Sequence, residues 1–262
     1  MWIRKLPILP TLITLLCVVI MFGLGIWQLE RKAEKDERLL QIAERQLSQP
    51  YSLEEIIANL PRNSNASSVI DIQDFPVSFT GLADLDKVFF IDNKIVNGKT
   101  GYHVVIPITT SSGTTVLANF GWLRGNGIRG ELPNLPIELH DYEVAKMQFS
   151  GVVSMPSINQ MVTETNKKFG EFPALLQQID LTQIEKHLSA LAFHPSGRTY
   201  PFVVNLNPDP NTEFVRNWQA VVMSPEKHLG YAAQWFGLGI AALTIYLLSL
   251  MKLTHTKNNK EK

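Results

Sequence analysis

Three side chains near the C-terminal end of the chain are of the kinds that bind a large apolar cofactor. His228 is followed by Tyr231 and Trp235 at the beginning of a charge-free stretch. If this stretch is helical, Tyr231 lies about 60° and Trp235 about 20° from His228 around the helix axis. A neutral imidazole nitrogen is an axial ligand of haem iron, and aromatic rings give the macrocycle apolar contact area. The type and spacing of these residues therefore suit a haem site with His228 as the iron ligand.

The same residues have a simpler interpretation. Tryptophan and tyrosine gather at membrane–water interfaces because their rings are amphipathic, and a histidine in the first turn of a membrane span can simply be solvated there. Ala233, Gly237 and Ala241 fall on the opposite side of the helix, and small residues every four positions allow another helix to approach closely. We therefore expect the small residues to pack on another helix, while His228 lies on the other face.

Two apolar segments, one near each end of the chain, are long enough to cross a membrane. No charged residue occurs between Leu6 and Leu29 or between Leu229 and Met251, and a helix as long as the first segment reaches about 33 Å. Basic residues outside both segments predict cytoplasmic termini. The predicted domains are a cytoplasmic N-terminus (1–5), a first span (6–28), an extracytoplasmic domain (29–224), a second span (225–251) and a basic cytoplasmic tail (252–262).

The first apolar segment has an alternative interpretation as a cleaved signal peptide. The stretch MWIRK supplies a positive n-region, and FGLG is a conceivable cleavage site. The apolar run is longer than a usual h-region, however, and no A-x-A pattern follows it. We predict an uncleaved anchor and, since no mitochondrial transit sequence precedes it, a bacterial inner-membrane protein.

Trp27, at the end of the first span, and Arg31, just beyond it, are expected to lie at the same depth in the membrane as the beginning of the second span. Arg31 follows Trp27 by about one helical turn. The propionates of a haem need a basic or hydrogen-bonding partner near the water boundary, and Arg31 or Lys227 can supply one. The predicted cofactor-binding residues are therefore His228, Tyr231, Trp235, Trp27 and Arg31, with His228 alone as a metal ligand.

The segment between the spans is predicted to be an α+β domain dominated by antiparallel strands, either a sheet or a partly closed barrel. Residues 30–47 continue the first span as a helix, Ser52 and Glu55 form a capping box, and residues 181–193 form a helix capped by Asp180. Stretches rich in β-branched and aromatic residues predict strands at 74–81, 87–92, 101–108, 114–123, 147–155, 202–206 and 217–223.

Composition excludes several classes of function. Lys plus Arg and Asp plus Glu both number 24, so there is no electrostatic reason to expect a nucleic acid as a partner. Cys17 is the single cysteine, which excludes an intramolecular disulfide, a CxxC motif and a thiolate copper carrier. No catalytic motif occurs, so we predict that the protein is not an enzyme. Four further histidines lack partners at metal-ligand spacing and are expected to be solvated: His103, His140, His187 and His194.

Three stretches together resemble the Surfeit-locus protein family: GIWQLERKAEKDERL (25–39), GYHVVIPI with GTTVLANFGWL (101–123), and NWQAVVMSPEKHLGYAAQWF (217–236). The resemblance implies a non-catalytic factor for assembly of cytochrome c oxidase, with the oxidase core subunit and haem a synthase as partners besides the lipid bilayer. It also implies haem a as the cofactor and His228 as the residue associated with it. Phe120 stands where the family usually has an arginine, so no role of that arginine is carried over.

Two hypotheses from different classes follow. In the first, the protein binds haem a on the extracytoplasmic side of the helix pair and presents it to the oxidase core subunit. In the second, it is a protein-binding scaffold that stabilises the core subunit without binding haem. The absorption spectrum of the purified protein distinguishes the two.

Overall fold

The computed structural model describes residues 7–58, 72–128, 131–136, 145–166, 168–191, 199–218 and 223–258. The chain divides into two compact units. One contains the two terminal helices, within residues 1–43 and 219–262, and the other contains the strands, within residues 44–218.

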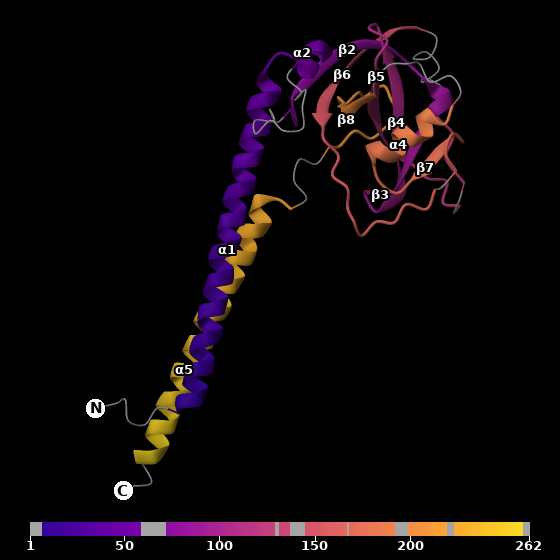
Figure 1. The fold of residues 1–262 in the computed structure, drawn as a ribbon. Coiled ribbons are helices and arrows are strands. Elements are labelled where there is room, and N and C mark those ends of the chain that lie inside the picture. Colours follow the sequence, from indigo (N-terminus) through magenta and orange to yellow (C-terminus); the bar gives the residue numbers. More distant parts are fainter. Residues whose placement is uncertain are drawn as a thin grey trace. The chain divides into compact units, whose positions relative to one another are not determined.

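The first unit is a pair of long helices, α1 (Ile8–Leu47) and α5 (Pro225–Asn258), which run side by side (Figure 1). Their contacts show that they are antiparallel. The hydroxyl of Thr11, early in α1, bonds that of Tyr246, late in α5, whereas Gln28 bonds His228 in the first turn of α5. The beginning of α1 and the end of α5 therefore lie at the same end of the pair.

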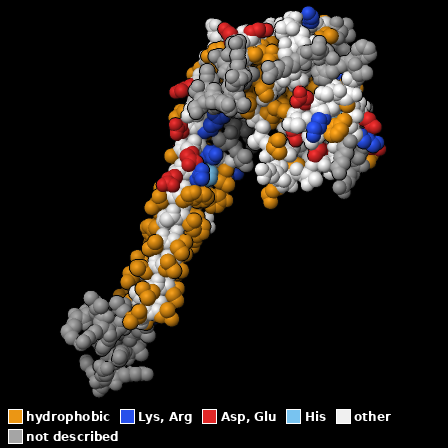
Figure 2. All heavy atoms as spheres, viewed as in Figure 1, with side chains coloured by type: hydrophobic (Ala, Val, Ile, Leu, Met, Phe, Trp, Pro, Cys, Tyr) orange, Lys and Arg blue, Asp and Glu red, His pale blue; other side chains and the backbone are white. Residues whose placement is uncertain are grey.

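Both helices are long and apolar enough to cross a membrane. Their most apolar windows have mean hydropathies of 2.5 and 1.6, and only 6% of the residues in each window are buried. Figure 2 shows the resulting apolar surface along the pair. The structure thus confirms two apolar helices at the predicted places, and α1 continues to Leu47 as predicted. The predicted boundaries of the spans stay a prediction.

The two helices meet along a seam with a seven-residue repeat. Among the less exposed positions of α1, one series alternates at spacings of three and four, a pattern that keeps one stripe of each helix facing its partner in a left-handed supercoil. The α1 members are Thr11, Thr14, Val18, Met21, Gly25, Gln28, Lys32, Lys35, Leu39 and Ile42, and the α5 members are His228, Ala232, Trp235, Gly239, Ala242 and Tyr246.

The face of α5 that packs on α1 is not the face predicted from the sequence. Ala233, Gly237 and Ala241 are exposed, and nothing lies within 4 Å of the place that a Cβ on Gly237 would take. His228 instead lies on the packed face. The prediction that the small residues contact the first helix while His228 points away from it is therefore wrong. The physical reason is that Phe22 and Phe236 need glycines opposite them, and these are Gly239 and Gly25.

Close packing at the seam comes from this reciprocal pair of glycines and phenylalanines. A Cβ on Gly25 would lie 2.5 Å from the Phe236 ring, and one on Gly239 would lie 2.7 Å from the Phe22 ring. The two rings meet edge to face with their centroids 5.4 Å apart. Each ring thus fills the space that the glycine of the other helix leaves open.

The second unit is built around a closed five-stranded barrel. Its strands follow in the order β2 (Pro76–Ala83), β6 (Met147–Ser154), β8 (Thr199–Leu206), β5 (Thr115–Arg124) and β4 (Lys99–Thr110). Pairing of β4 with β2 closes the circle. All of these pairings are antiparallel except the parallel pair β5–β8. Of the two predicted architectures, a sheet or a barrel, the barrel is the one formed.

Short elements extend the barrel on two sides. β3 (Phe89–Val96) pairs with β4, and β7 (Ala174–Leu176) pairs parallel to β3. β1 (Tyr51–Ser52) pairs parallel to β2 and leads into α2 (Leu53–Ala58), while the 3-10 turn η2 (Leu85–Lys87) joins β2 to β3. At the β3–β4 hairpin, Asn97 and Gly98 both have positive φ, at 51° and 73°, as a tight two-residue turn requires.

Two apolar cores lie on the two sides of the barrel wall. On β5, Val116, Ala118 and Phe120 belong to the core inside the barrel, whereas Leu117 belongs to the outer core. The outer core is covered by α4 (Leu181–Ser189), which contributes Ile184. Because both faces are covered, nine of the ten residues of β5 are buried, whereas a strand with one wet face would alternate.

Most of the predicted elements of this domain are present. Both predicted caps are confirmed: Ser52 and Glu55 exchange hydrogen bonds of 2.7 and 3.2 Å, and Asp180 accepts from two amides of α4. Six of the predicted strands correspond to β2, β3, β4, β5, β6 and β8. The seventh, at 217–223, lies partly outside the described residues, and residues 217–218 are not in a strand.

Candidate functional site

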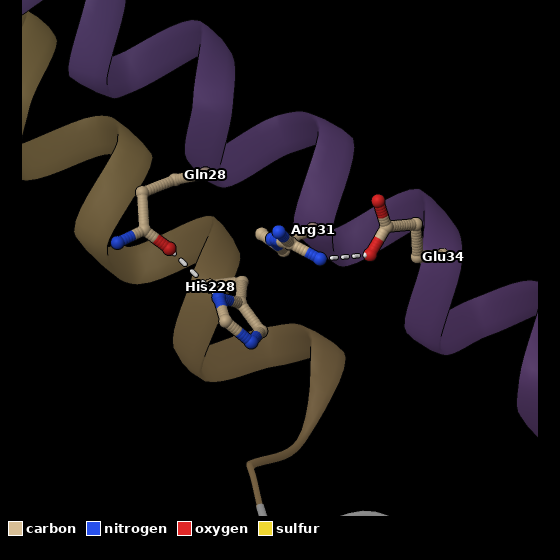
Figure 3. Close-up of polar contacts among 4 residues, drawn as sticks. All are labelled: Gln28, Arg31, Glu34 and His228. Atoms are coloured by element: carbon tan, nitrogen blue, oxygen red, sulfur yellow. Dashed lines mark hydrogen bonds and ion pairs between the residues drawn. The ribbon is translucent and has the colours of Figure 1, made fainter.

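His228 lies at one end of the helix seam, in the first turn of α5. Ser224 precedes the helix, and its backbone carbonyl oxygen accepts a hydrogen bond from the Lys227 amide at 3.1 Å. The side chain of His228 is nearly enclosed, since the residue is only 8% exposed. Its Nδ1 lies 2.7 Å from Oε1 of Gln28 on α1, and Figure 3 shows the two side chains facing each other across the seam. Among the described residues, no other hydrogen bond of His228 is formed, and none involves its Nε2.

The two residues predicted on α1 lie on the outer surface of that helix. Trp27 is 47% exposed, and the guanidinium of Arg31 lies 5.7 Å from the centroid of its indole ring. Arg31 also donates to the Glu34 carboxylate at 2.6 Å (Figure 3). Both partners are about half exposed, and ion pairs of this kind contribute about 0–1 kcal/mol. The cation is therefore held loosely by its own helix.

The two aromatic residues of α5 differ in their surroundings. Tyr231 is 45% exposed, whereas Trp235 is half-buried on the seam. The structure therefore places His228 and Trp235 together in the seam, with Tyr231 and Trp27 on the exposed surface of the same helix pair. The site has an enclosed imidazole and exposed aromatic rings.

Sequence reasoning assigned no role to Gln28 and Glu34, although both are within the GIWQLERKAEKDERL stretch. The sequence does contain a sign of this role. Gln28 has a polar side chain at a position of the seven-residue repeat, whereas the two preceding members, Met21 and Gly25, are not polar. A polar group at such a position generally has a partner on the facing helix. The repeat becomes visible only when α1 and α5 are aligned in antiparallel register.

Two histidines of the barrel domain, His103 and His187, were expected to be solvated, and this expectation is wrong. His187 is completely buried and is surrounded by Phe89, Phe169 and Phe172, and neither ring nitrogen has a hydrogen-bond partner among the described residues. Burial lowers its pKa, although Glu164 acts in the opposite direction. His103 is half-buried, and its Nδ1 accepts from Asn119 at 3.4 Å. His140 and His194 lie outside the described residues.

Burial makes the barrel domain sensitive to acid. Desolvation and the Lys94 cation lower the pKa of His103 to about 4, against 6.5 in an unfolded chain. The unfolded state thus binds more protons between pH 6.5 and 4, so stability present above pH 6.5 is lost as the pH falls towards 4. We expect this histidine to account for a loss of up to about 3 kcal/mol. The measurement is urea unfolding of the full chain at both pH values.

The variant His103→Gln is the control for this prediction. Glutamine keeps a polar side chain beside Asn119 but has no proton to bind in this range. It should lose less unfolding free energy between pH 6.5 and 4 than the wild-type protein. Equal losses in the two proteins would contradict the assignment to His103.

The barrel domain also has a cleft of about 630 Å³, whose lining includes Asp92, Asn93, Tyr102, Gly125, Thr165 and Gln177. Burial and the nearby Asp92 carboxylate raise the pKa of Tyr102. The cleft lining has no histidine or cysteine. Within the described part of the chain, no three His, Cys, Asp or Glu side chains gather in a way that could hold a metal ion.

Comparison with known proteins connects this helix pair and barrel to a family. A family model described as the SURF1 family matches residues 15–240, which include the whole barrel and parts of both apolar helices. The chain belongs to the SURF1 family. It is also 24% identical over 258 residues to a SURF1-like protein of Dictyostelium discoideum, with 90% of this chain and 94% of the relative covered. The SURF1 family consists of assembly factors of cytochrome oxidase rather than of enzymes.

Phe120 stands at the position where the resemblance to the family implied an arginine. Phe120 is 1% exposed and belongs to the core inside the barrel. An arginine does lie nearby, since Arg216 donates its Nε proton to the Phe120 carbonyl oxygen at 2.7 Å and Nη1 donates to that of Asn207 at 2.8 Å. The guanidinium in this part of the SURF1 chain thus comes from the segment after β8.

Proposed function

We propose that this SURF1 family member assists cytochrome c oxidase assembly by holding haem a at the end of the helix pair where α5 begins, and by presenting it to the oxidase core subunit. The observation that carries the proposal is the state of His228. Its ring is enclosed on the packed face, its Nδ1 is bonded to Gln28, and its Nε2 has no partner within the described residues. A ring held in this way is suited to bind iron through Nε2.

The residues around His228 fit a haem that is cargo and not a permanent cofactor. One histidine supplies one axial ligand, whereas a tightly held haem commonly has further anchors. Trp27 and Tyr231, both nearly half exposed, offer apolar ring surface for the macrocycle. An incomplete ligand set of this kind supports binding that is loose enough for release.

Arg31 is the proposed partner of a haem propionate. Its present partner is Glu34 on the same exposed helical surface, and exchange of one carboxylate for another costs little at such a place. A guanidinium can donate two parallel hydrogen bonds to a carboxylate. The propionate would therefore replace the Glu34 carboxylate as the partner of Arg31.

The proposed location is a bacterial inner membrane, and the proposed partners are the oxidase core subunit and haem a synthase. The two apolar helices support insertion into a membrane, and the basic residues outside them support cytoplasmic termini with the barrel domain on the periplasmic side of a bacterial inner membrane. The oxidase core subunit would receive the haem a, and haem a synthase would supply it.

A specific observation favours the alternative, a scaffold that binds the core subunit without haem. The exposed face of α5 contains Ala233, Gly237 and Ala241, with open space around Gly237. Small residues on a membrane helix allow close packing by a helix of another protein. This face could hold the core subunit whether or not His228 binds iron.

Absorption spectroscopy of the full-length protein distinguishes the two functions. We expect the protein purified from a haem-a-producing strain to have a haem a spectrum that is lost in His228→Ala. The variant His103→Gln should keep it, since that residue is in the barrel domain. A colourless wild-type protein that still captures the core subunit would support the scaffold and overturn the haem proposal.

A further inference from the structure

We infer that Gln28 is a positioning residue that holds His228 in the tautomer with its proton on Nδ1, and thereby leaves the lone pair on Nε2. The inference concerns the protein without ligand. Its consequence for haem binding rests on the proposed function, whereas the tautomer does not.

The contact between the two side chains determines which of them donates. The atom of Gln28 that lies 2.7 Å from Nδ1 is Oε1, the carbonyl oxygen of the amide. A carbonyl oxygen only accepts, so Nδ1 must donate. In a neutral imidazole, one nitrogen carries the proton and the other carries the lone pair. Nε2 of His228 is therefore the nitrogen with the lone pair.

The surroundings of the pair prevent the ring from turning freely. His228 is 8% exposed and Gln28 is half-buried, and both occupy seam positions of their helices. Further along the seam, the interlocked Gly25 and Phe236 fix the spacing of the helices. Loss of the amide would leave a buried N–H group without an acceptor, which is unfavourable. The ring would then lose its preference for this tautomer.

The effect on a ligand follows from the same argument. Partners that hydrogen-bond the second nitrogen of a metal-binding histidine fix its orientation and raise its basicity, and their removal lowers metal affinity about 10–100-fold. We expect a loss of this size in haem a affinity for Gln28→Leu. Gln28→Glu keeps an oxygen acceptor in the same place and should retain the affinity at a pH where the ring is neutral.

Nitrogen NMR of the ligand-free protein in micelles, with ¹⁵N-labelled histidine, tests the inference. His228→Ala identifies the resonances of this ring. At a pH high enough to keep the ring neutral, we expect the Nδ1–H form in the wild type and in Gln28→Glu, and a mixture of tautomers in Gln28→Leu. The control Gln234→Leu makes the same chemical change on an exposed position of α5 and should leave the wild-type spectrum.

The outcomes separate this inference from the proposed function. An Nε2–H form in the wild type, or an unchanged tautomer in Gln28→Leu, would overturn the role of Gln28 whatever the protein binds. If the tautomer responds as expected but haem a fails to bind the wild type, the role of Gln28 stands and the haem function fails. A merely structural role of Gln28 would lower stability in Gln28→Leu without changing the tautomer.

Discussion

Replacement of Phe120 by arginine should unfold the barrel domain. Phe120 is 1% exposed and packs against the rings of Phe149 and Phe214, with centroids 6.2 and 6.0 Å away. A guanidinium at this position would be buried among apolar side chains, and an uncompensated buried charge costs about 3–5 kcal/mol. That is a large part of the roughly 5–15 kcal/mol that stabilises a domain. The measurement is urea unfolding of the full chain followed by tryptophan fluorescence.

Phe120→Leu is the matched control for this substitution. Leucine leaves a small cavity but introduces no charge, and its cost should be limited to about 1–2 kcal/mol. If Phe120→Arg were as stable as Phe120→Leu, the side chain would have to reach solvent, and the barrel core would differ from the one described.

The second large effect is expected from Gly25→Leu in α1. The Cβ of any side chain at this position would already lie 2.5 Å from the Phe236 ring. Overpacking of this kind costs about 1–3 kcal/mol, and in a seam of two helices it should force them apart. Double electron–electron resonance between spin labels on the native, exposed Cys17 and on a cysteine at Ile240 reports the separation. We expect a longer and broader distance distribution.

Gly23→Leu is the control, because none of the described residues outside its own helical turn lies within 4 Å of a Cβ at that position. The same comparison exists on α5, where Gly239→Leu should separate the helices and Gly237→Leu should not. Equal effects of Gly23→Leu and Gly25→Leu would show that the register of the two helices is wrong.

The sequence predicted local features of the fold well. The capping residues Ser52 and Asp180 and the strand stretches are recognisable because they depend on hydrogen bonds and side-chain alternation within a few residues. Closure of the barrel depends instead on the pairing of β2 with β4, which are separated along the chain by β3. Nothing local to either strand indicates that pairing, so a sheet and a barrel were equally compatible with the pattern.

The candidate site was predicted only in part, for a related reason. His228 and its aromatic neighbours could be found from residue type and helical spacing. The orientation of α5 could not, because two stripes of small residues compete for the contact: Ala233, Gly237 and Ala241 on one side, and Ala232 with Gly239 on the other. Only the facing residues of α1 decide between them. Gln28 was missed because its role depends on this same register.

Rescue by free imidazole is the most direct test of the central claim, that the His228 ring binds haem a through Nε2. His228→Gly removes the ring and leaves a space that a free imidazole can fill. We expect the purified variant in micelles to lose haem a binding, and millimolar imidazole to restore both the binding and the wild-type spectrum. A variant that binds haem a as well as the wild type without imidazole, or that fails to recover with it, would contradict the claim.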